Sequence, residues 1–64
     1  MTYFPGDRVK AARRLGGVWA GWVDAGTAGL VLEDRAIIGV RYYVEFENGV
    51  IVDWLTSEDI VPAL

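Results

Sequence analysis

The sequence lacks cysteine and histidine altogether. Without cysteine the chain has neither a disulfide nor a thiolate metal site, and a reducing compartment such as the cytoplasm is the setting that we expect. Without histidine it lacks the commonest general base and the commonest transition-metal ligand, which leaves carboxylates alone for acid–base chemistry. We therefore expect no cofactor, no metal and no catalytic residue.

Long apolar runs are missing as well. No run approaches the ~20 residues of a membrane-spanning helix, and the opening residues MTYFPGDR contain no secretory apolar segment. A chain of 64 residues forms one domain at most and buries only about 60% of the surface that it exposes when unfolded. The sequence thus predicts a single cytoplasmic domain over residues 1–64, with a small core and no contact with a membrane.

The net charge of −3 conceals an uneven distribution. Residues 1–32 carry four cationic side chains against two carboxylates, whereas residues 33–64 carry two against seven. A basic strand can contact phosphates, yet the acidic net charge opposes nonspecific nucleic-acid binding, because its affinity comes largely from phosphate neutralisation. Nucleic acid is therefore the alternative partner. Its candidate binding residues are Arg8, Lys10, Arg13 and Arg14.

Glycine and proline divide the chain into short segments, as they do in all-β proteins. Five strands are predicted, at residues 8–14, 27–33, 40–47, 50–55 and 60–64. The connections are a long arm at 15–26, a link at 34–39 and a single turn at 56–59. That turn reads TSED, and Ser or Thr before acids is typical of a helical start. We expect no helix longer than about a turn.

The dipeptide Asn48-Gly49 between apolar-rich runs predicts a hairpin, because both central residues of a type I′ turn need positive φ. A two-residue loop places Tyr43 opposite Trp54 on the outer face. The inner face then holds Tyr42, Val44, Phe46, Ile51 and Leu55. This register also points the Asp53 carboxylate inward, unless a bulge turns it out.

The order of these elements resembles the SH3-like small barrel, and the expected fold class is all-β, a single closed five-stranded antiparallel barrel of that kind. FPGDRV, GTAGLV, YYVEF, VDWL and PA are similar, in that order, to the barrel domain of nitrile hydratase beta chains. YVEFENG followed by EDIVP looks like Tudor-type barrels, and GDRV with WAG is similar to the type II dihydrofolate reductases. These resemblances imply a fold more than an activity.

The reductase resemblance implies the one concrete enzymatic alternative. Those enzymes are tetramers of small barrels whose central pore binds folate and nicotinamide through a Val-Gln-Ile-Tyr segment. The comparable segment here is IVDW, with Asp53 and Trp54 in place of the glutamine and the tyrosine. Because that motif is absent, we expect a non-catalytic protein.

The chain has more large rings than a small core can enclose. Some aromatic surface should therefore be exposed, and Trp, Tyr and Arg dominate protein-binding hot spots. The candidate protein-binding residues are Trp19, Trp22, Tyr43 and Trp54. The Tudor resemblance implies an alternative use, an aromatic cage for a methylated side chain, with Tyr43, Trp54 and a tryptophan of the arm as walls and Glu45 as the acid.

The expected function is that of a protein-interaction or accessory module, whose partner is another protein or a second copy of the chain. A small core without disulfide or metal is marginally stable alone, and oligomerisation is one remaining means of stabilisation. An open strand edge at 60–63 and the outward rings of Tyr43 and Trp54 offer surface for a symmetric contact. We expect a homodimer there; the alternative is a monomer whose 15–26 arm covers the rings.

Overall fold

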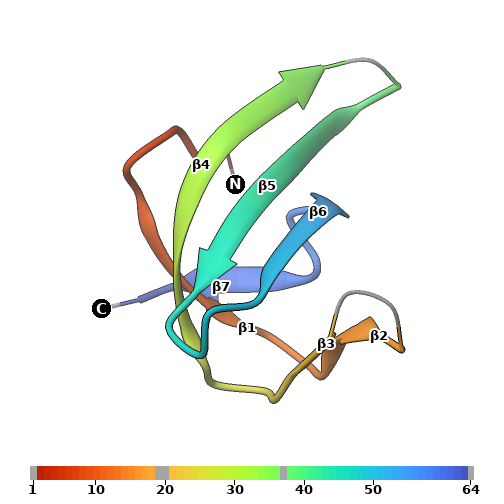
Figure 1. Ribbon diagram of the computed structural model, residues 1–64. Helices are drawn as coiled ribbons and strands as arrows, with labels where there is room; N and C mark the ends of the chain where they lie inside the picture. Colours follow the sequence, from red (N-terminus) through yellow and green to blue (C-terminus); the bar gives the residue numbers. More distant parts are fainter. Residues whose placement is uncertain (1, 19–20, 37, 64) are drawn as a thin grey trace.

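The computed structural model describes residues 2–18, 21–36 and 38–63, which form seven β-strands and no helix (Figure 1). The strands are β1 (Arg8–Ala11), β2 (Leu15–Gly17), β3 (Gly21–Val23), β4 (Ala28–Ala36), β5 (Val40–Phe46), β6 (Ile51–Leu55) and β7 (Ile60–Pro62). The all-β prediction is confirmed. Over the same ranges, no helix has the length and apolar character needed to span a bilayer.

Within the described ranges, five strands form one antiparallel sheet in the order β6-β5-β4-β1-β7, and β2 pairs with β3 in a separate two-stranded sheet. The edge strands β6 and β7 do not pair with each other in this order. The sheet is therefore open and strongly bent, and the predicted closed barrel is wrong. Closure needs matched tilt and stagger along both edges, and β7, with three residues, offers little backbone for it.

Two predicted boundaries also differ from the structure. Residues 34–36, predicted as a link, continue β4, which pairs with β5 as far as Ala36 opposite Val40. This long β4–β5 hairpin projects beyond the other strands at the top of Figure 1. The predicted arm is itself a small hairpin, in which Gly16 faces Trp22. A Cβ on Gly16 would overlap the carbonyl oxygen of Gly21, so the two strands approach closely only because glycine stands there.

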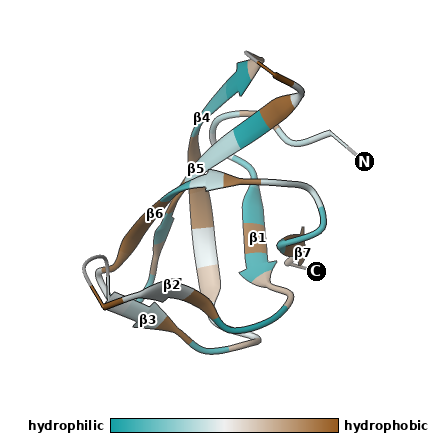
Figure 2. Ribbon diagram, turned by 90° about the vertical axis from the view of Figure 1, so that its right-hand side faces the viewer, coloured by the Kyte–Doolittle hydropathy of each residue, from teal (hydrophilic) through white to brown (hydrophobic). Residues whose placement is uncertain are grey.

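The core lies on the inner side of the bent sheet. Along β1, Val9 is fully buried and Ala11 nearly so, while Arg8 and Lys10 are exposed; Figure 2 shows this alternation as teal and brown bands. Alternation along β1 therefore separates an exposed basic face from a buried apolar one. The buried apolar side chains are Tyr3, Val9, Ala11, Leu15, Val23, Val31, Tyr42, Val44, Phe46, Val52, Leu55 and Ile60.

Tyr3 closes the core from the N-terminal side. Its ring meets Tyr42 edge to face, with 5.5 Å between ring centroids. Its backbone N–H donates to the Tyr42 hydroxyl (3.1 Å). Burial raises the pKa of the Tyr3 phenol, and the nearby Tyr42 and Asp7 add to this effect. The N-terminal segment is thereby held on the sheet by a side chain to which the sequence assigned no role.

The β5–β6 turn has three residues instead of the predicted two. The N–H of Phe46 donates to the carbonyl of Val50, and the N–H of Gly49 donates to the carbonyl of Phe46, both at 2.9 Å. Gly49 has φ 87° and Asn48 does not have positive φ, the pattern of a type I turn followed by a glycine bulge. The register slips by one residue, which exposes Ile51 and buries Val52, the reverse of the prediction.

Candidate protein-binding surface

A β-bulge in β6 brings Trp54 to the surface. Asp53 and Trp54 together stand opposite Tyr43 alone, which defines the bulge. The extra residue restores the pairing of Tyr42 with Leu55 that the sequence predicts. Asp53 is exposed. Of the two arrangements left open for its carboxylate, the structure adopts the one in which a bulge turns it out.

Trp54 adopts a backbone conformation that large side chains avoid. Its φ is 65°, and in the described part of the chain every other residue with positive φ is a glycine. A bulky residue in this left-handed region costs on the order of 1–2 kcal/mol. Trp54 is 55% exposed, so burial of this residue does not offset the cost. Backbone strain of this kind collects at functional sites, which makes the surface around Trp54 the first candidate.

Two arginines stack on the two outward rings. The guanidinium carbon of Arg41 lies 5.9 Å from the centroid of the Trp54 ring, and that of Arg35 lies 6.0 Å from the centroid of Tyr43. Both distances fall within the ~6 Å range of cation–π attraction. Arg35 belongs to β4, Arg41 and Tyr43 to β5, and Trp54 to β6. We call these four residues the arginine–aromatic patch.

The patch surrounds a small hollow of about 20 Å³ that Asp53 also lines. Arg35 is held in place by an ion pair with Glu33, with 2.8 Å between its Nη2 and the carboxylate Oε2. Arg41 takes part in none of the ion pairs in the described part of the chain. The patch therefore presents a guanidinium without an acidic partner beside a half-exposed indole.

The structure does not assemble the predicted aromatic cage from the residues that it describes. A methylated cation needs free ring faces, yet the chain's own arginines stack on Tyr43 and Trp54. Glu45, the expected acid, lines a different hollow. Trp19, which could have supplied a wall from the arm, lies outside the described residues, as does its predicted role in protein binding.

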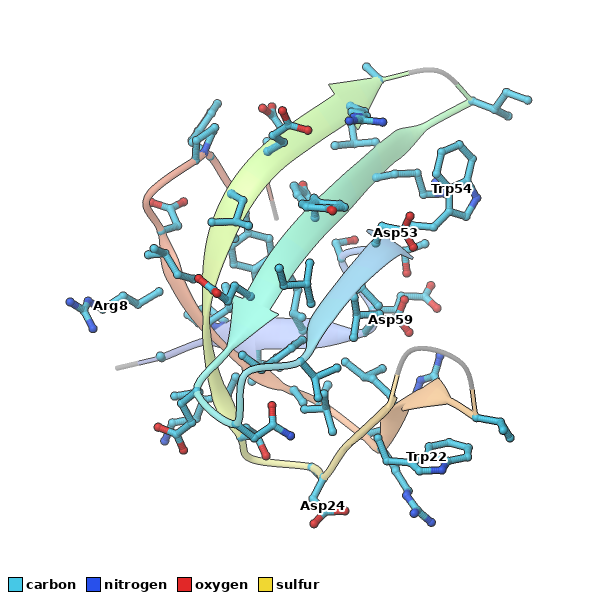
Figure 3. The ribbon with its side chains drawn as sticks, in the orientation of Figure 1. Arg8, Trp22, Asp24, Asp53, Trp54 and Asp59 are labelled. Carbon is cyan, nitrogen blue, oxygen red and sulfur yellow. The ribbon has the colours of Figure 1, made fainter. Side chains whose placement is uncertain are left out.

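Trp22 lies apart from the patch, on β3. The guanidinium carbon of Arg14 stands 4.3 Å from the centroid of its ring. The Nδ2 of Asn48 donates to the Trp22 carbonyl (3.1 Å), which ties the β2–β3 hairpin to the β5–β6 turn. Figure 3 shows Trp22 and Trp54 well separated, with Asp59 between them. Of the predicted protein-binding residues that the structure describes, Trp22, Tyr43 and Trp54, it therefore brings together Tyr43 and Trp54.

Of the four basic residues predicted to bind nucleic acid, two lie on β1 and two in the segment that follows it. Arg8 and Lys10 point outward from β1, whereas Arg13 forms an ion pair with Asp59 and the guanidinium of Arg14 covers an indole. Two of the four cations are thus engaged within the chain. Two free cations are few for a phosphate-binding strand, since each neutralised phosphate adds to the affinity.

Asp59 is the carboxylate that the sequence did not single out. It is buried and accepts hydrogen bonds from the Thr56 N–H (2.8 Å), the Thr56 hydroxyl (3.2 Å) and Arg13. Burial alone would raise the pKa of Asp59, but these hydrogen bonds and the Arg13 charge outweigh it and lower the pKa. These contacts of Asp59 therefore stabilise the 56–59 turn. The spacing Thr-x-x-Asp, that of a capping box, was its sequence signal.

A metal-binding group or a buried polar atom without a partner would be a further sign of a site in the described part of the chain. There, no group of three or more Asp, Glu, His or Cys side chains is placed to hold a metal ion. Every buried side-chain nitrogen or oxygen in this part of the chain has a hydrogen-bond partner. Comparison with protein-family models, with curated proteins and with solved structures gives no match. The function is therefore inferred from the chain's own residues.

Proposed function

We propose that the chain is a cytoplasmic, non-catalytic protein-interaction module, or an accessory subunit of a larger complex, that binds its partner through the arginine–aromatic patch. The observation that carries this proposal is Trp54, which combines a φ of 65° with an exposed fraction of 55%. A tryptophan in that position costs stability and contributes little to the core. Such a residue is expected where the ring contacts a partner.

The side chains of the patch fit a partner segment that presents an apolar or aromatic side chain beside a carboxylate. Trp54 and Tyr43 offer rigid apolar surface, which loses little conformational entropy on binding. Arg41 lacks an acidic partner among the ion pairs of the described residues, and its planar guanidinium suits bidentate pairing with a carboxylate. Trp, Tyr and Arg are also the residue types that dominate hot spots.

The order of connections supports an SH3-like architecture for this module, in an open form. The β2–β3 hairpin lies in the sequence between β1 and β4, β5 and β6 are joined by a tight turn, and a single turn at 56–59 leads to β7. The likeness of FPGDRV and VDWL to the barrel domain of nitrile hydratase beta chains supports the accessory-subunit form of the proposal. The order of connections and this likeness bear on the architecture alone, whereas the function is proposed from the residues of the patch.

Affinity capture from an extract of the native cell tests this proposal. The baits are the wild-type chain, Trp54→Ala, Arg41→Ala and the matched control Phe4→Ala, which removes an aromatic ring that is 60% exposed and does not belong to the patch. The expected result is a protein retained by the wild type and by Phe4→Ala but lost with both patch variants. Equal retention by all four baits, or turnover of a small substrate by the purified chain, contradicts the proposal.

A further inference from the structure

Two charged columns flank an apolar strip on the outer face of the five-stranded sheet. The strip belongs to β4, and the columns belong to its neighbours β1 and β5 and the turn that follows β5. Side chains alternate between the two faces of each strand, and Val9, Val31 and Phe46 occupy the buried face. The six outer residues are Arg8 and Lys10 in the basic column, Ala28 and Leu30 in the strip, and Glu45 and Glu47 in the acidic column. We call this surface the outer charged face.

The strand register arranges these residues in two matching rows. Leu30 faces Arg8 on one side and Glu45 on the other. The second row runs in the same order through Lys10, Ala28 and Glu47, with the Glu47 N–H donating to the Ala28 carbonyl at 2.8 Å. Each row therefore runs from a cation on β1, through an apolar residue on β4, to a carboxylate on β5 or in the turn after it.

The four charges of this face have no ion-pair partner in the described part of the chain. Adjacent strands lie about 4.8 Å apart, so the backbones that carry the two columns stand about 10 Å apart, with β4 between them. An open hollow of about 470 Å³ lies over the strip. In Figure 3 the side chain of Arg8 points away from the body of the domain. The charges are thus available to a partner.

We propose that the outer charged face binds the same face of a second copy of the chain. A two-fold axis that runs parallel to β4 in the plane of the interface turns the basic column of one copy over the acidic column of the other and keeps the rows in step. Arg8 of each copy then meets Glu45 of the other, Lys10 meets Glu47, and the two Leu30 side chains meet near the axis. The faces pack as two aligned sheets.

The order of the charges selects this arrangement over the other face-to-face dimer. A two-fold axis across the strands would place Arg8 and Lys10 of both copies over one another, and like charges in contact oppose association. The hollow over the outer charged face shares no lining residue with the hollow of the arginine–aromatic patch. The contact is thus distinct from a dimer through the rings of Tyr43 and Trp54, whereas Ala63, at the end of the 60–63 edge, also lines the hollow over the outer charged face.

Sedimentation equilibrium over a wide range of concentration, at low and high salt, tests the proposal with two charge-reversal variants. Arg8→Glu/Lys10→Glu makes both columns acidic, and Glu45→Lys/Glu47→Lys makes both basic. The wild type should dimerise, more weakly as salt screens the charges. Each variant alone should dimerise on the order of a hundredfold more weakly, because four attractions become repulsions. An equimolar mixture should form a heterodimer, because every column then faces its opposite.

Three outcomes would overturn the proposal. They are a wild type with the mass of one chain at every concentration, a dimer that both reversal variants retain, and folded variants that do not associate when mixed. A dimer that both reversal variants retain but that Trp54→Ala loses is one form of the second outcome. It would place the contact at the arginine–aromatic patch. Glu58→Lys, a charge reversal at an exposed position outside both the face and the arginine–aromatic patch, should leave the dimer unchanged. If a reversal variant does not fold, Arg8→Gln and Glu45→Gln provide the same test with a smaller loss.

Discussion

At the residue scale, Trp54 and Asp59 have opposite effects on stability. Trp54 holds the backbone at φ 65° while its ring stays half exposed, so the residue lowers the stability of the strand that carries it. Asp59 is buried with its carboxylate bonded to Thr56 and Arg13. It joins the turn before β7 to the segment after β1. The first residue is placed for a partner, and the second holds the fold together.

The conformation of Trp54 predicts an unusual order of stability among its variants. Glycine adopts positive φ readily, so Trp54→Gly should be more stable than Trp54→Ala by about 1 kcal/mol. At Ile51, an exposed position of the same strand without positive φ, the order should be reversed, because glycine weakens an ordinary strand. Urea unfolding followed by circular dichroism measures both pairs. A Trp54→Ala variant more stable than Trp54→Gly would show that the backbone is not left-handed there.

The lowered pKa of Asp59 predicts how stability depends on pH. A carboxyl whose pKa is lower in the folded state stabilises the fold above the ordinary range near pH 4, and this contribution is lost as the pH falls through the folded pKa. Asp59→Asn should therefore be less stable than the wild type by about 1–3 kcal/mol at neutral pH. The difference should shrink as the pH falls below about 4.

Urea unfolding at a series of pH values measures this difference. Glu58→Gln, at the exposed neighbouring position, is the control and should follow the wild type throughout. A difference between the wild type and Asp59→Asn that stays constant down to low pH would mean that the charge of Asp59 does not stabilise the fold.

At the scale of elements, alternation and glycine predicted the five strands of the large sheet but neither their ends nor the strands β2 and β3 within the arm. The two faces of β1 follow from alternation alone. Residues 34–36 read as a link because two of them are charged, yet they continue β4 because Arg35 pairs with Arg41 across the hairpin. Local polarity could not reveal that pairing, since it depends on a strand elsewhere in the chain. A Cβ on Gly29 would lie 2.8 Å from side-chain atoms of Phe46 and Val44, so these side chains pack here against glycine.

The register of the β5–β6 hairpin shows the limit of a turn signal. Asn48-Gly49 is compatible with a two-residue loop and with a three-residue loop, and the two differ by one residue in register. That single step decides whether Ile51 or Val52 is buried. Nothing in the sequence indicated the bulge at Trp54, because tryptophan is not a residue that predicts positive φ.

Gly16 predicts how the β2–β3 hairpin responds to substitution. Gly16 has φ 90°, and an added Cβ would overlap the Gly21 carbonyl, whereas a Cβ on Gly17 would meet nothing within 4 Å. Gly16→Ala should therefore destabilise the hairpin by about 1–3 kcal/mol, and Gly17→Ala should change little. Hydrogen exchange of the Trp22 and Val23 amides measures the effect. Equal protection in both variants would contradict the close approach of β2 and β3.

At the scale of the whole molecule, the bent sheet carries two separate surfaces, the arginine–aromatic patch and the outer charged face. Half of the patch could be predicted, because Tyr43 and Trp54 were expected to face outward. The arginines could not, because Arg35 reaches Tyr43 only through the extension of β4. A tryptophan of the arm was the third wall of the alternative cage, but the hairpin that carries Trp22 is tied to the β5–β6 turn instead.

The central claim is that the chain binds a protein partner through the arginine–aromatic patch, and site-specific photo-crosslinking in the native cell tests it most directly. A photoreactive benzophenone side chain would replace Asp53, which is exposed and lines the hollow of the patch, in one variant and Phe4, an exposed residue outside the patch, in the other. We predict a covalent adduct of one defined mass from position 53 and none from position 4. No adduct from position 53, or the same adducts from both positions, would contradict this claim.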